Sequence, residues 1–468
     1  MTDTKNIPDS IREKMVQAGI SAPAIRSFEA NYLKLAQGET GMMSESTLSP
    51  VDSIPSFNDL EEPNLIPTEL GAKLVVVKLN GGLGTGMGLD KAKSLLEVKD
   101  GLTFLDLISR QILFLRKAVN PQLQFLLMNS FSTRKDSLHY LEQYPELPNG
   151  RPMDFLQSKV PKISVDTMEP LDWPADPGLE WCPPGHGDIY LSLFATGLLD
   201  QLIRDGIQYA FISNSDNLGA YPDFKILQYM DQESIPFLME VTRRTEADRK
   251  GGHLARRKSD KRLVLREGAQ CPSADQDAFQ DIEKHGFFNT NNLWIRLDHL
   301  RALMSENGGY LPLPLIRNEK TVDPTKSDSP AVYQLETAMG AAIEMFEGAQ
   351  ALEVPRTRFA PVKKTDDLLA LRSDAYEITE DFRVQLIQER HGIPPTIKLD
   401  SEYFKMINGF DRHISSIPSL KDCKRLTVKG SVLFEKPVSV KGDVTVTNSK
   451  SDSRPLPEGS YCDQEVDV

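Results

Sequence analysis

A glycine-rich segment directly after a short apolar run is the feature that most constrains this chain. Residues 74–77 read Leu-Val-Val-Val, and residues 80–88 read Asn-Gly-Gly-Leu-Gly-Thr-Gly-Met-Gly. The apolar run predicts a buried strand. Glycines leave backbone N–H groups unshielded and tolerate positive φ angles, so phosphates and a nucleobase can come close to the main chain. The segment therefore predicts a phosphate-binding loop at a strand end, with a mobile linker as the alternative.

The spacing of these glycines excludes two other phosphate-binding motifs. The glycines do not fall as G-x-G-x-x-G, and no helix is expected to start at the loop. Both points disfavour a dinucleotide fold and an NAD-dependent oxidoreductase. Met87 stands where a Walker P-loop has its lysine, so that motif is absent as well. A lysine follows shortly downstream, at Lys93, although most lysines are solvated surface residues.

Short apolar runs alternate with helical patterns in the middle of the chain. Residues 125–128 and 209–212 are apolar runs that end in polar residues, and a pattern typical of a capped helix lies at 103–115. A further helix is expected over residues 335–346. This alternation predicts an α/β fold with a central, mostly parallel mixed sheet. The polar motifs fall at the carboxyl ends of strands, where open α/β sheets bind ligands.

The C-terminal part has a different period. Residues 426–449 divide into four six-residue units, LTVKGS, VLFEKP, VSVKGD and VTVTNS, each apolar at its first and third positions. This period predicts a short left-handed β-helix, with two ordinary hairpins as the alternative. Beyond Asn448 we expect a loose acidic tail. The expected parts are thus residues 1–70 (helical and irregular), 71–375 (catalytic) and 376–468 (hexads and tail).

Composition limits the possible partners and location. The 468 residues carry a net charge of −13, which argues against a general nucleic-acid surface. The four cysteines are far apart and form no C-x-x-C pair, which indicates a reducing compartment. The N-terminal ten residues are polar, and no apolar run near the motifs is long enough to span a bilayer. We expect a cytoplasmic protein that binds neither nucleic acid nor membranes.

Several motifs together resemble one enzyme family. The loop from Leu79 to Gly88, followed by Lys93-Ser-Leu95, is similar to the nucleotide-binding loop of the UTP–glucose-1-phosphate uridylyltransferases of the long-chain, eukaryotic type. Further motifs follow in family order: Gln157-Ser158, Pro183–Asp188, Asn214–Ala220, Lys250–Gly252, Phe288–Trp294, Gln334–Thr337 and Val354–Lys363. The resemblance covers about residues 70–445. Gly86, Ser215 and residues 89–92 depart from the family pattern, which affects local packing and not the chemistry.

The resemblance implies a fold and a nucleotide site. The fold is the Rossmann-like nucleotidyltransferase fold, related to type A glycosyltransferases. Gln157 is implied to hydrogen-bond the uracil edge, and His186 to donate to a phosphate or orient the substrate. The remaining implied nucleotide contacts are Leu79, Asn80, Gly81, Gly82, Gly185, Asn214 and Ser215. Without the resemblance, His186 is equally well explained as a structural residue of a turn.

The resemblance also implies a metal site, a sugar site and two catalytic lysines. Mg²⁺ usually takes one or two carboxylates plus substrate phosphates, and Asp216 at a strand end suits that role. An Asp in such a place often only caps a turn. Gly252, Asn289 and Asn291 are implied to bind the sugar, because short amides supply donors and acceptors for hydroxyls. Lys93 and Lys363 are implied to neutralise the transferring phosphates.

The reaction implied by the resemblance joins UTP and glucose-1-phosphate into UDP-glucose and pyrophosphate, reversibly. Two anions must meet, so positioning and positive charge are what the protein must supply. We expect direct in-line attack of the sugar phosphate on the α-phosphate of UTP, with Mg²⁺ as cofactor. Because the acidic tail is expected to shield the β-helix end, a monomer or dimer is expected.

Two alternatives to this activity remain. One is a broad-specificity UDP-sugar or UDP-N-acetylhexosamine pyrophosphorylase, although such enzymes typically carry an Arg in the glycine loop, where this chain has Thr85 and Met87. The other is a non-catalytic module that binds UDP-sugars. Loss of Lys93, Asp216 or Lys363 would have favoured that module, and all three are present.

Overall fold

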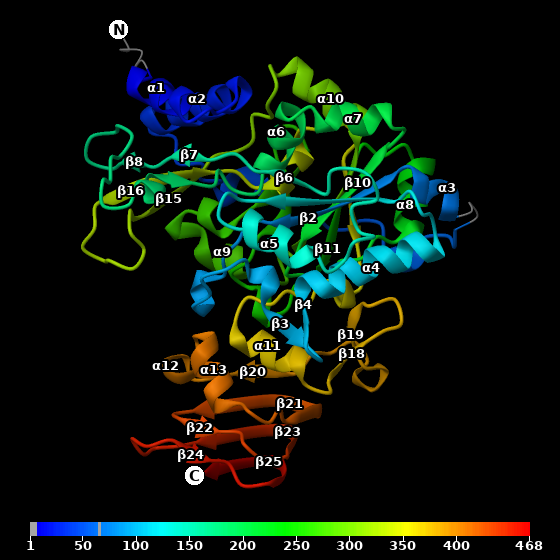
Figure 1. Ribbon diagram of the computed structural model, residues 1–468, viewed down its shortest axis with the longest axis vertical. Helices are drawn as coiled ribbons and strands as arrows, with labels where there is room; N and C mark the ends of the chain where they lie inside the picture. Colours follow the sequence, from blue (N-terminus) through cyan, green and yellow to red (C-terminus); the bar gives the residue numbers. More distant parts are fainter. Residues whose placement is uncertain (1–6, 64–66) are drawn as a thin grey trace.

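A ten-stranded mixed sheet forms the centre of the computed structural model, which describes residues 7–63 and 67–468 (Figure 1). Its main path runs in the order β1 (Leu48–Ser49), β12 (His253–Arg257), β14 (Phe287–Arg296), β10 (Tyr209–Asn214), β2 (Leu74–Asn80), β5 (Gln124–Asn129) and β6 (Asp154–Leu156). Three more strands branch from it: β11 (Phe237–Arg243), β13 (Leu263–Arg266) and β17 (Gln350–Glu353). The predicted α/β class with a central mixed sheet is confirmed. The sheet is not mostly parallel as predicted, because β14 runs antiparallel to β10, β11 and β12, and β12 runs antiparallel to β1 and β13.

The neighbouring strands β10, β2, β5 and β6 are parallel, and every residue of β2 and β5 is buried. Alternate side chains of a strand point to opposite faces. Val75 and Val77 therefore pack with one apolar cluster, while Leu74 and Val76 pack with another. The register pairs Leu79 with Asn214 and Asn80 with Asn129, so three strands end at one edge of the sheet.

Helices cover both faces of this sheet (Figure 1). One face carries α3 (Pro67–Ala72), α4 (Phe104–Ala118), α5 (Arg134–Leu141) and α8 (Phe224–Gln232). The other carries α6 (Asp188–Ala195), α7 (Leu198–Arg204) and α10 (Leu297–Glu306). The predicted capping box at the start of α4 is confirmed, because the Thr103 hydroxyl accepts from the Asp106 N–H while the Asp106 carboxylate accepts from the Thr103 N–H. A short α9 (Gln276–Gln280) lies beside the sheet.

The N-terminal helices α1 (Asp9–Gln17) and α2 (Ala22–Ala36) share an apolar cluster with small peripheral strands (Figure 1). These strands are β7 (Val160–Pro161), β8 (Ile163–Ser164), β9 (Trp181–Cys182), β15 (Ile316–Thr321) and β16 (Ala331–Glu336). The helix predicted over residues 335–346 is wrong: Leu335 belongs to β16, and Met339–Glu344 forms a 3₁₀ helix. Parts of the expected irregular N-terminal segment, residues 1–6 and 64–66, lie outside the described residues.

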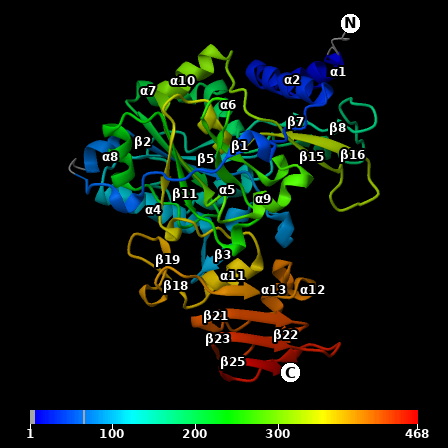
Figure 2. The same cartoon turned by 180° about the vertical axis from the view of Figure 1, so that it is seen from behind.

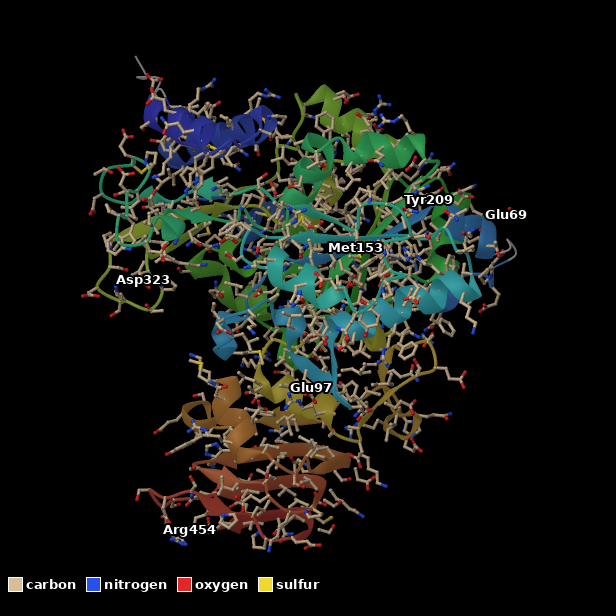
Figure 3. The ribbon with its side chains drawn as sticks, viewed as in Figure 1. Glu69, Glu97, Met153, Tyr209, Asp323 and Arg454 are labelled. Carbon is tan, nitrogen blue, oxygen red and sulfur yellow. The ribbon has the colours of Figure 1, made fainter. Side chains whose placement is uncertain are left out.

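The C-terminal part hangs below the central sheet and is joined to it through α11 (Thr365–Arg372) and the hairpin β3 (Glu97–Lys99) and β4 (Leu102–Thr103). Figure 3 labels Glu97 at this junction, with Tyr209 in the central sheet above it and Arg454 in the C-terminal sheet below. Four smaller elements complete the connection: β18 (Tyr376–Ile378), β19 (Val384–Leu386), α12 (Ser401–Phe404) and α13 (Ile407–His413).

The C-terminal sheet is a stack of parallel strands (Figure 2). Its order is β20 (Thr396–Lys398), β21 (Ser419–Lys429), β23 (Val438–Thr447) and β25 (Gly459–Asp467), and β22 (Val432–Leu433) pairs with β24 (Arg454–Pro455) on a second face. Leu426 pairs with Val444, three hexads further on. The parallel pairing contradicts two ordinary hairpins. The left-handed β-helix stays a prediction.

Every apolar hexad position faces inward, as the six-residue period predicts. These residues are Leu426, Val428, Val432, Phe434, Val438, Val440, Val444 and Val446, and all are buried. The prediction of a loose tail is wrong. Its residues form β24 and β25, and β25 pairs along most of β23. Among the described residues, none of the helices has the length and apolar character needed to cross a membrane.

Candidate active site

The glycine loop and the loop after β10 meet at the edge where the parallel strands end. The Ser215 N–H donates to the Leu79 carbonyl over 3.1 Å, which joins the two loops through their main chains. Asn80 ends β2 with its side chain buried, where its amide donates to Asn129 Oδ1 (2.7 Å) and Ser137 Oγ (2.8 Å). The Asn80 side chain, together with its carbonyl, which accepts from Thr133 Oγ1 over 2.6 Å, therefore fixes the start of the loop.

The glycine loop is folded back onto Lys93 and is not an open linker. Gly84 and Gly88 adopt left-handed backbone angles, with φ of 71° and 75°. The Lys93 N–H donates to the Gly82 carbonyl over 3.0 Å, and a Cβ at Gly84 would lie 3.1 Å from Lys93 Cγ. A Cβ at Gly82 would meet nothing within 4 Å. The loop thus leaves main chain open to a ligand while it holds Lys93 in place.

Lys93 and Asp216 form an ion pair across the two loops. Lys93 Nζ lies 2.5 Å from Asp216 Oδ2, and the two side chains are 16% and 22% exposed. A ligand can therefore reach both groups. Among the described residues, no group of three or more His, Cys, Asp or Glu side chains is placed to hold a metal ion. A cation here would take Asp216 as its protein ligand and its other oxygens from substrate or water, which is the usual pattern for Mg²⁺.

The segment before Lys363 is attached to the Asp216 loop by hydrogen bonds. The Val362 N–H donates to the Asp216 carbonyl over 3.2 Å. Asn217, which our sequence analysis did not single out as a site residue, joins the same segments. Its Oδ1 accepts from the Ala360 N–H (2.9 Å), and its Nδ2 donates to the Arg358 carbonyl (3.3 Å). The glycine loop, the Asp216 loop and the segment before Lys363 are therefore joined by hydrogen bonds, and Lys93 and Lys363 belong to one connected framework.

A buried ion pair between Arg358 and Glu240 stabilises this framework. The Arg358 guanidinium donates to both oxygens of Glu240, over 2.6 and 2.8 Å. The same carboxylate accepts from Asn292 Nδ2 and from Trp294 Nε1, so its oxygens are well satisfied. A bidentate pair of this kind combines charge with fixed geometry. It binds β11, β14 and the 356–363 segment together.

Lys363 is exposed and lies on the sugar side of the candidate site. Its N–H donates to Asp367 Oδ2 over 2.7 Å, and its Nζ is 6.0 Å from the centre of the Phe288 ring. Burial raises the pKa of Glu267, and the nearby charge of Lys363 and a hydrogen bond from Asn289 oppose that rise. Glu267 belongs to no motif that we recognised in the sequence, yet it lies beside the predicted sugar residues.

The predicted sugar residues form a compact polar corner. Asn289 Nδ2 donates to Asn291 Oδ1 (2.8 Å), and the Asn291 N–H donates back to Asn289 Oδ1 (2.9 Å). Asn291 has a φ of 58°, a conformation that Asn tolerates well. The Asn289 N–H donates to the Gly252 carbonyl, and a Cβ at Gly252 would lie 2.5 Å from Glu267 Oε2. The corner therefore needs glycine at 252.

The predicted uracil residues come together beside the glycine loop. A Cβ at Gly81 would lie 3.0 Å from Gln157 Nε2, so the amide of Gln157 packs on this glycine. Asp188 holds the adjacent backbone: its Oδ2 accepts from the Ser158 N–H (2.6 Å) and from Ser192 Oγ (2.7 Å). Burial raises the pKa of Asp188 to about 6, and these hydrogen bonds oppose the rise.

Gly185 and His186 are fixed by contacts with the segment after β16. Gly185 has a φ of 81°, and a Cβ there would lie 2.5 Å from the Thr337 carbonyl oxygen. His186 Nδ1 accepts from the Met339 N–H over 2.9 Å, and burial lowers the pKa of His186 to about 4. The imidazole is therefore neutral near pH 7 and carries its proton on Nε2. It can donate one hydrogen bond but adds no positive charge.

Comparison with known proteins identifies the family. The model of the family described as UTP–glucose-1-phosphate uridylyltransferase matches residues 25–441. The chain belongs to this family. The UTP–glucose-1-phosphate uridylyltransferase of Saccharomyces cerevisiae is 42% identical over 396 residues, which cover 84% of this chain and 78% of that protein.

Solved structures agree with this assignment to the uridylyltransferase family. A mutant UDP-glucose pyrophosphorylase from Leishmania major, in complex with UDP-Glc, superimposes with a TM-score of 0.95 and 49% identity, covering 99% of this chain and 100% of that one. A UDP-glucose phosphorylase from Trypanosoma brucei gives a TM-score of 0.92 and 48% identity, covering 98% and 99%.

Within this uridylyltransferase framework, the residues predicted from sequence lie around one edge of the central sheet. Asn214 and Ser215 adjoin Leu79, Lys93 contacts Asp216, and Gln157 lies on Gly81. Sequence analysis missed Glu267, and it did not single out Asp188 or Asn217 for a role. Asp188 and Asn217 lie inside recognised motifs and show their role only through long-range hydrogen bonds. No local signal marked Glu267.

Proposed function

We propose that the protein is a UTP–glucose-1-phosphate uridylyltransferase that forms UDP-glucose and pyrophosphate from UTP and glucose-1-phosphate, reversibly. The observation that carries this proposal is the ion pair of Lys93 with Asp216 beside the glycine loop, with Lys363 attached to the same loop through Val362. Family membership over residues 25–441 and the likeness to a structure solved with UDP-Glc support it.

The proposed mechanism is direct transfer in one step. UTP lies along the main chain of the glycine loop, with its uracil at Gln157 and Gly185. Glucose-1-phosphate lies at Gly252, Asn289 and Asn291, and its phosphate oxygen attacks the α-phosphorus in line as pyrophosphate leaves. This step needs no side-chain nucleophile, only positioning and charge.

The charges of the candidate site are placed for such a step. Two anionic substrates repel each other, and Lys93 and Lys363 approach from the nucleotide side and the sugar side respectively. His186 is neutral near pH 7, so its Nε2–H orients a substrate oxygen without adding charge. Glu267 accepts a hydrogen bond from the Asn289 side chain and so helps to fix the orientation of that amide. The protein thus supplies its positive charge from the two lysines.

We propose Mg²⁺ as the cofactor, held by Asp216. One accessible carboxylate, that of Asp216, fits an ion that takes most of its ligands from phosphates and water. When bound, the ion supplies charge neutralisation at the phosphate oxygens. Asp216 Oδ2 is shared with Lys93 in the structure, so Lys93 also orients this carboxylate.

The test of the proposed function is pyrophosphate release from UTP with a panel of sugar-1-phosphates. Glucose-1-phosphate should be preferred over N-acetylglucosamine-1-phosphate, because the mutual hydrogen bonds of Asn289 and Asn291 fix this corner, and a fixed corner accommodates the larger N-acetyl group poorly. Comparable kcat/KM values for the two sugars would favour the broad-specificity alternative. Absence of pyrophosphate release with every sugar would contradict the proposal.

We further propose that the protein acts in the cytoplasm as a monomer or dimer. The four free cysteines support a reducing compartment. The reason first given for limited assembly, shielding by a loose tail, does not hold, because those residues form β25. Instead β25 ends the stack with Asp463, Glu465 and Asp467, all exposed, and charged side chains on an edge strand oppose pairing with another copy.

A further inference from the structure

Lys78 is a buried cation next to the candidate site, and the proposed mechanism does not use it. It lies in β2, two residues before the glycine loop, and is only 2% exposed. Its Nζ donates to Ser213 Oγ and to the Ala220 carbonyl, each over 2.8 Å, and lies 5.8 Å from the centre of the Phe211 ring. None of the ion pairs between described residues includes Lys78 as a direct partner.

An ammonium in this place is costly. Lysine is almost never fully buried unless it is paired with an opposite charge, and burial of an uncompensated charge is strongly unfavourable. Burial, together with the nearby charge of Arg358, accordingly lowers the pKa of Lys78 to about 7, and Glu240 and Asp216 oppose the change. The other buried positions of β2 before Lys78 are apolar, and an apolar residue would fit the strand at a lower cost.

The two acceptors of Lys78 indicate what the buried ammonium does in this place. Ser213 and the Ala220 carbonyl lie on either side of residues 214–219, the loop that contains Asp216. The Lys78 ammonium, which lies in the sheet, therefore hydrogen-bonds to both ends of this loop. In the middle of the loop, Asp216 contacts Lys93, and its carbonyl accepts from the Val362 N–H. Lys78 therefore holds the two ends of the loop, while Lys93 and Val362 hold its middle.

We propose that Lys78 is a positioning residue for nucleotidyl transfer: its buried ammonium fixes the 213–220 loop and thereby places Asp216 against Lys93. The proposal rests on the proposed function. Lys78 acts through the loop and not by contact with substrate. Because Asn214 and Ser215 share this loop, its effect falls on the nucleotide and on turnover, and not on the sugar corner around Asn289.

The test is Lys78→Met, which keeps the length of the side chain and removes the charge and both hydrogen bonds. We expect kcat to fall by about tenfold or more, since misplaced preorganised charge commonly has such effects. The KM for UTP should rise several-fold, and the KM for glucose-1-phosphate should stay within about twofold. Thermal stability should change little, because relief of the buried ammonium offsets the loss of its hydrogen bonds to Ser213 and Ala220. Wild-type values of kcat and of the KM for UTP would overturn the proposal.

Lys162→Met is the matched control. Lys162 is 5% exposed, donates to the Val322 carbonyl over 2.9 Å, and has a pKa lowered by burial, but it lies in the peripheral strands and not at the site. Its kinetic constants should equal those of the wild type. If Lys162→Met lowers kcat as strongly as Lys78→Met, the loss is a general effect of removing a buried lysine, and the proposal is wrong.

A pH profile of kcat distinguishes the effect of the Lys78 charge from the effect of the shape of its side chain. The ammonium of Lys78 is present at low pH and is lost as pH rises through its pKa, whereas methionine is neutral throughout. Arg358, Glu240 and Asp216 face Lys78 and are unchanged in the variant. The ratio of wild-type kcat to Lys78→Met kcat should therefore be larger at pH 6 than at pH 9. A ratio independent of pH would show that Lys78 has only a structural role.

Hydrogen exchange keeps the proposal testable whatever the activity of the protein. Backbone amides of residues 213–220 should exchange faster in Lys78→Met than in the wild type, without any substrate. If Lys78→Met does not fold, Ser213→Ala removes one acceptor with little change in volume and should also raise exchange in this loop. Unchanged exchange overturns the positioning role, whereas absence of pyrophosphate release by the wild type contradicts the proposed function alone.

Discussion

Single residues in the candidate site fall into two groups that differ in what their polar atoms contact. The side chains of Asn80, Asp188 and Asn217 form hydrogen bonds with backbone groups and neighbouring side chains, and these bonds fix the loops. Lys93, which is partly buried and paired with Asp216, and the exposed Lys363 present positive charge to a ligand. Substitutions in the first group should change substrate affinity and stability, and substitutions in the second should change turnover.

Replacement of either lysine by alanine tests the second group. Lys93→Ala and Lys363→Ala should each lower kcat by about 10²-fold or more, as loss of one preorganised electrostatic contact often does. Neither ammonium lies in an apolar core, so melting temperatures should change little. Steady-state kinetics with saturating UTP and glucose-1-phosphate measure the effect. Near-wild-type turnover would remove that lysine from the mechanism.

Asp216→Asn tests the metal site. Asparagine keeps the size of the side chain and loses the anionic oxygen that Mg²⁺ prefers, so the variant should need much more Mg²⁺ for half-maximal activity. The loss of the ion pair with Lys93 adds to this effect. A Mg²⁺ titration of kcat at saturating substrates gives the measurement. An equal loss of activity at all Mg²⁺ concentrations would mean that Asp216 orients substrate instead.

Asp188→Asn tests a pH dependence of stability. The pKa of Asp188 is raised by burial from its ordinary value of 3.8 to about 6. Protonation therefore favours the folded state, and this contribution is present at acid pH and lost as pH rises through about 6. At pH 8 the ionised carboxylate costs about 3 kcal/mol, which neutral asparagine relieves. Asp188→Asn should be more stable than wild type in urea at pH 8 and nearly equal at pH 3.5, because the wild-type loss develops between the unfolded pKa of 3.8 and the folded pKa of about 6.

A control for this prediction is Asp188→Ala, which removes the acceptor as well as the charge. The Ser158 N–H then loses its partner beside Gln157, so the KM for UTP should rise. In Asp188→Asn the acceptor remains, and the KM for UTP should stay close to the wild-type value. If the stability difference between wild type and Asp188→Asn is the same at both pH values, the carboxylate is not the source of the pH dependence.

Elements from distant parts of the chain hold the catalytic loops. Met87 of the glycine loop, Leu218 of the Asp216 loop and Val362 next to Lys363 all pack in the apolar cluster that includes Val440 of the C-terminal sheet. On the sugar side, the short N-terminal segment around Glu45 contacts Arg266, the neighbour of Glu267. Both ends of the chain therefore support the site without lining it.

Glu45→Gln tests the N-terminal contact. The Glu45 carboxylate lies 2.6 Å from Arg266 Nη1, 2.8 Å from Lys284 Nζ and 3.0 Å from His285 Nε2, and Arg266 is fully buried. Asp275 still lies 3.1 Å from Arg266 Nη2, so the substitution removes one of the two carboxylate partners of the buried guanidinium, and loss of a hydrogen bond to a charged group costs about 1.5–3 kcal/mol. We expect lower stability and a several-fold higher KM for glucose-1-phosphate, with the KM for UTP unchanged. A rise in the KM for UTP of the same size would contradict this local role.

The central elements could be predicted from sequence because their signals are local. The apolar runs of β2, β5 and β10 and the capping box of α4 each lie within a few residues. The helix predicted around Leu335 failed because its periodic residues span a break: the Thr337 N–H donates to the Pro184 carbonyl, which ends β16 and starts a different segment. Partners such as Lys78 with Ala220 are far apart in sequence and leave no local pattern.

The C-terminal strand shows why polar composition misled the prediction of a tail. β25 bonds to β23 through its main chain over most of its length, so it needs few apolar side chains. Tyr461 and Val466 alone pack from this strand against the buried cluster. A strand at the end of a stack covers one neighbour and leaves its other face to solvent, which permits the sequence Asp-Gln-Glu-Val-Asp at 463–467.

At the scale of the whole molecule, the last coil closes the C-terminal stack. In both views the chain ends at the far side of this sheet from the central body (Figures 1 and 2). The predicted site residues lie in the central body, and we expect the site to be complete within one chain. We therefore expect assembly to depend on the exposed edge of β25 and not on any need to complete the site.

Deletion of residues 450–468 tests how this edge limits assembly. The deletion removes β24 and β25, uncovers the main-chain edge of β23, and exposes apolar residues such as Val440 and Val446 to which β25 is paired. Unpaired strand edges recruit other chains, so self-association should increase. Light scattering coupled to size exclusion should show a monomer or dimer for the full chain and larger species for the deletion.

A matched variant with Asp463→Asn, Glu465→Gln and Asp467→Asn keeps the strand and removes its charge. If this variant self-associates, the negative charges of β25 are what prevent self-association of the full chain. If the variant stays dispersed, the paired strand itself prevents it. If the deletion stays as dispersed as the full chain, or if the full chain is a stable octamer at moderate salt, β25 does not control assembly.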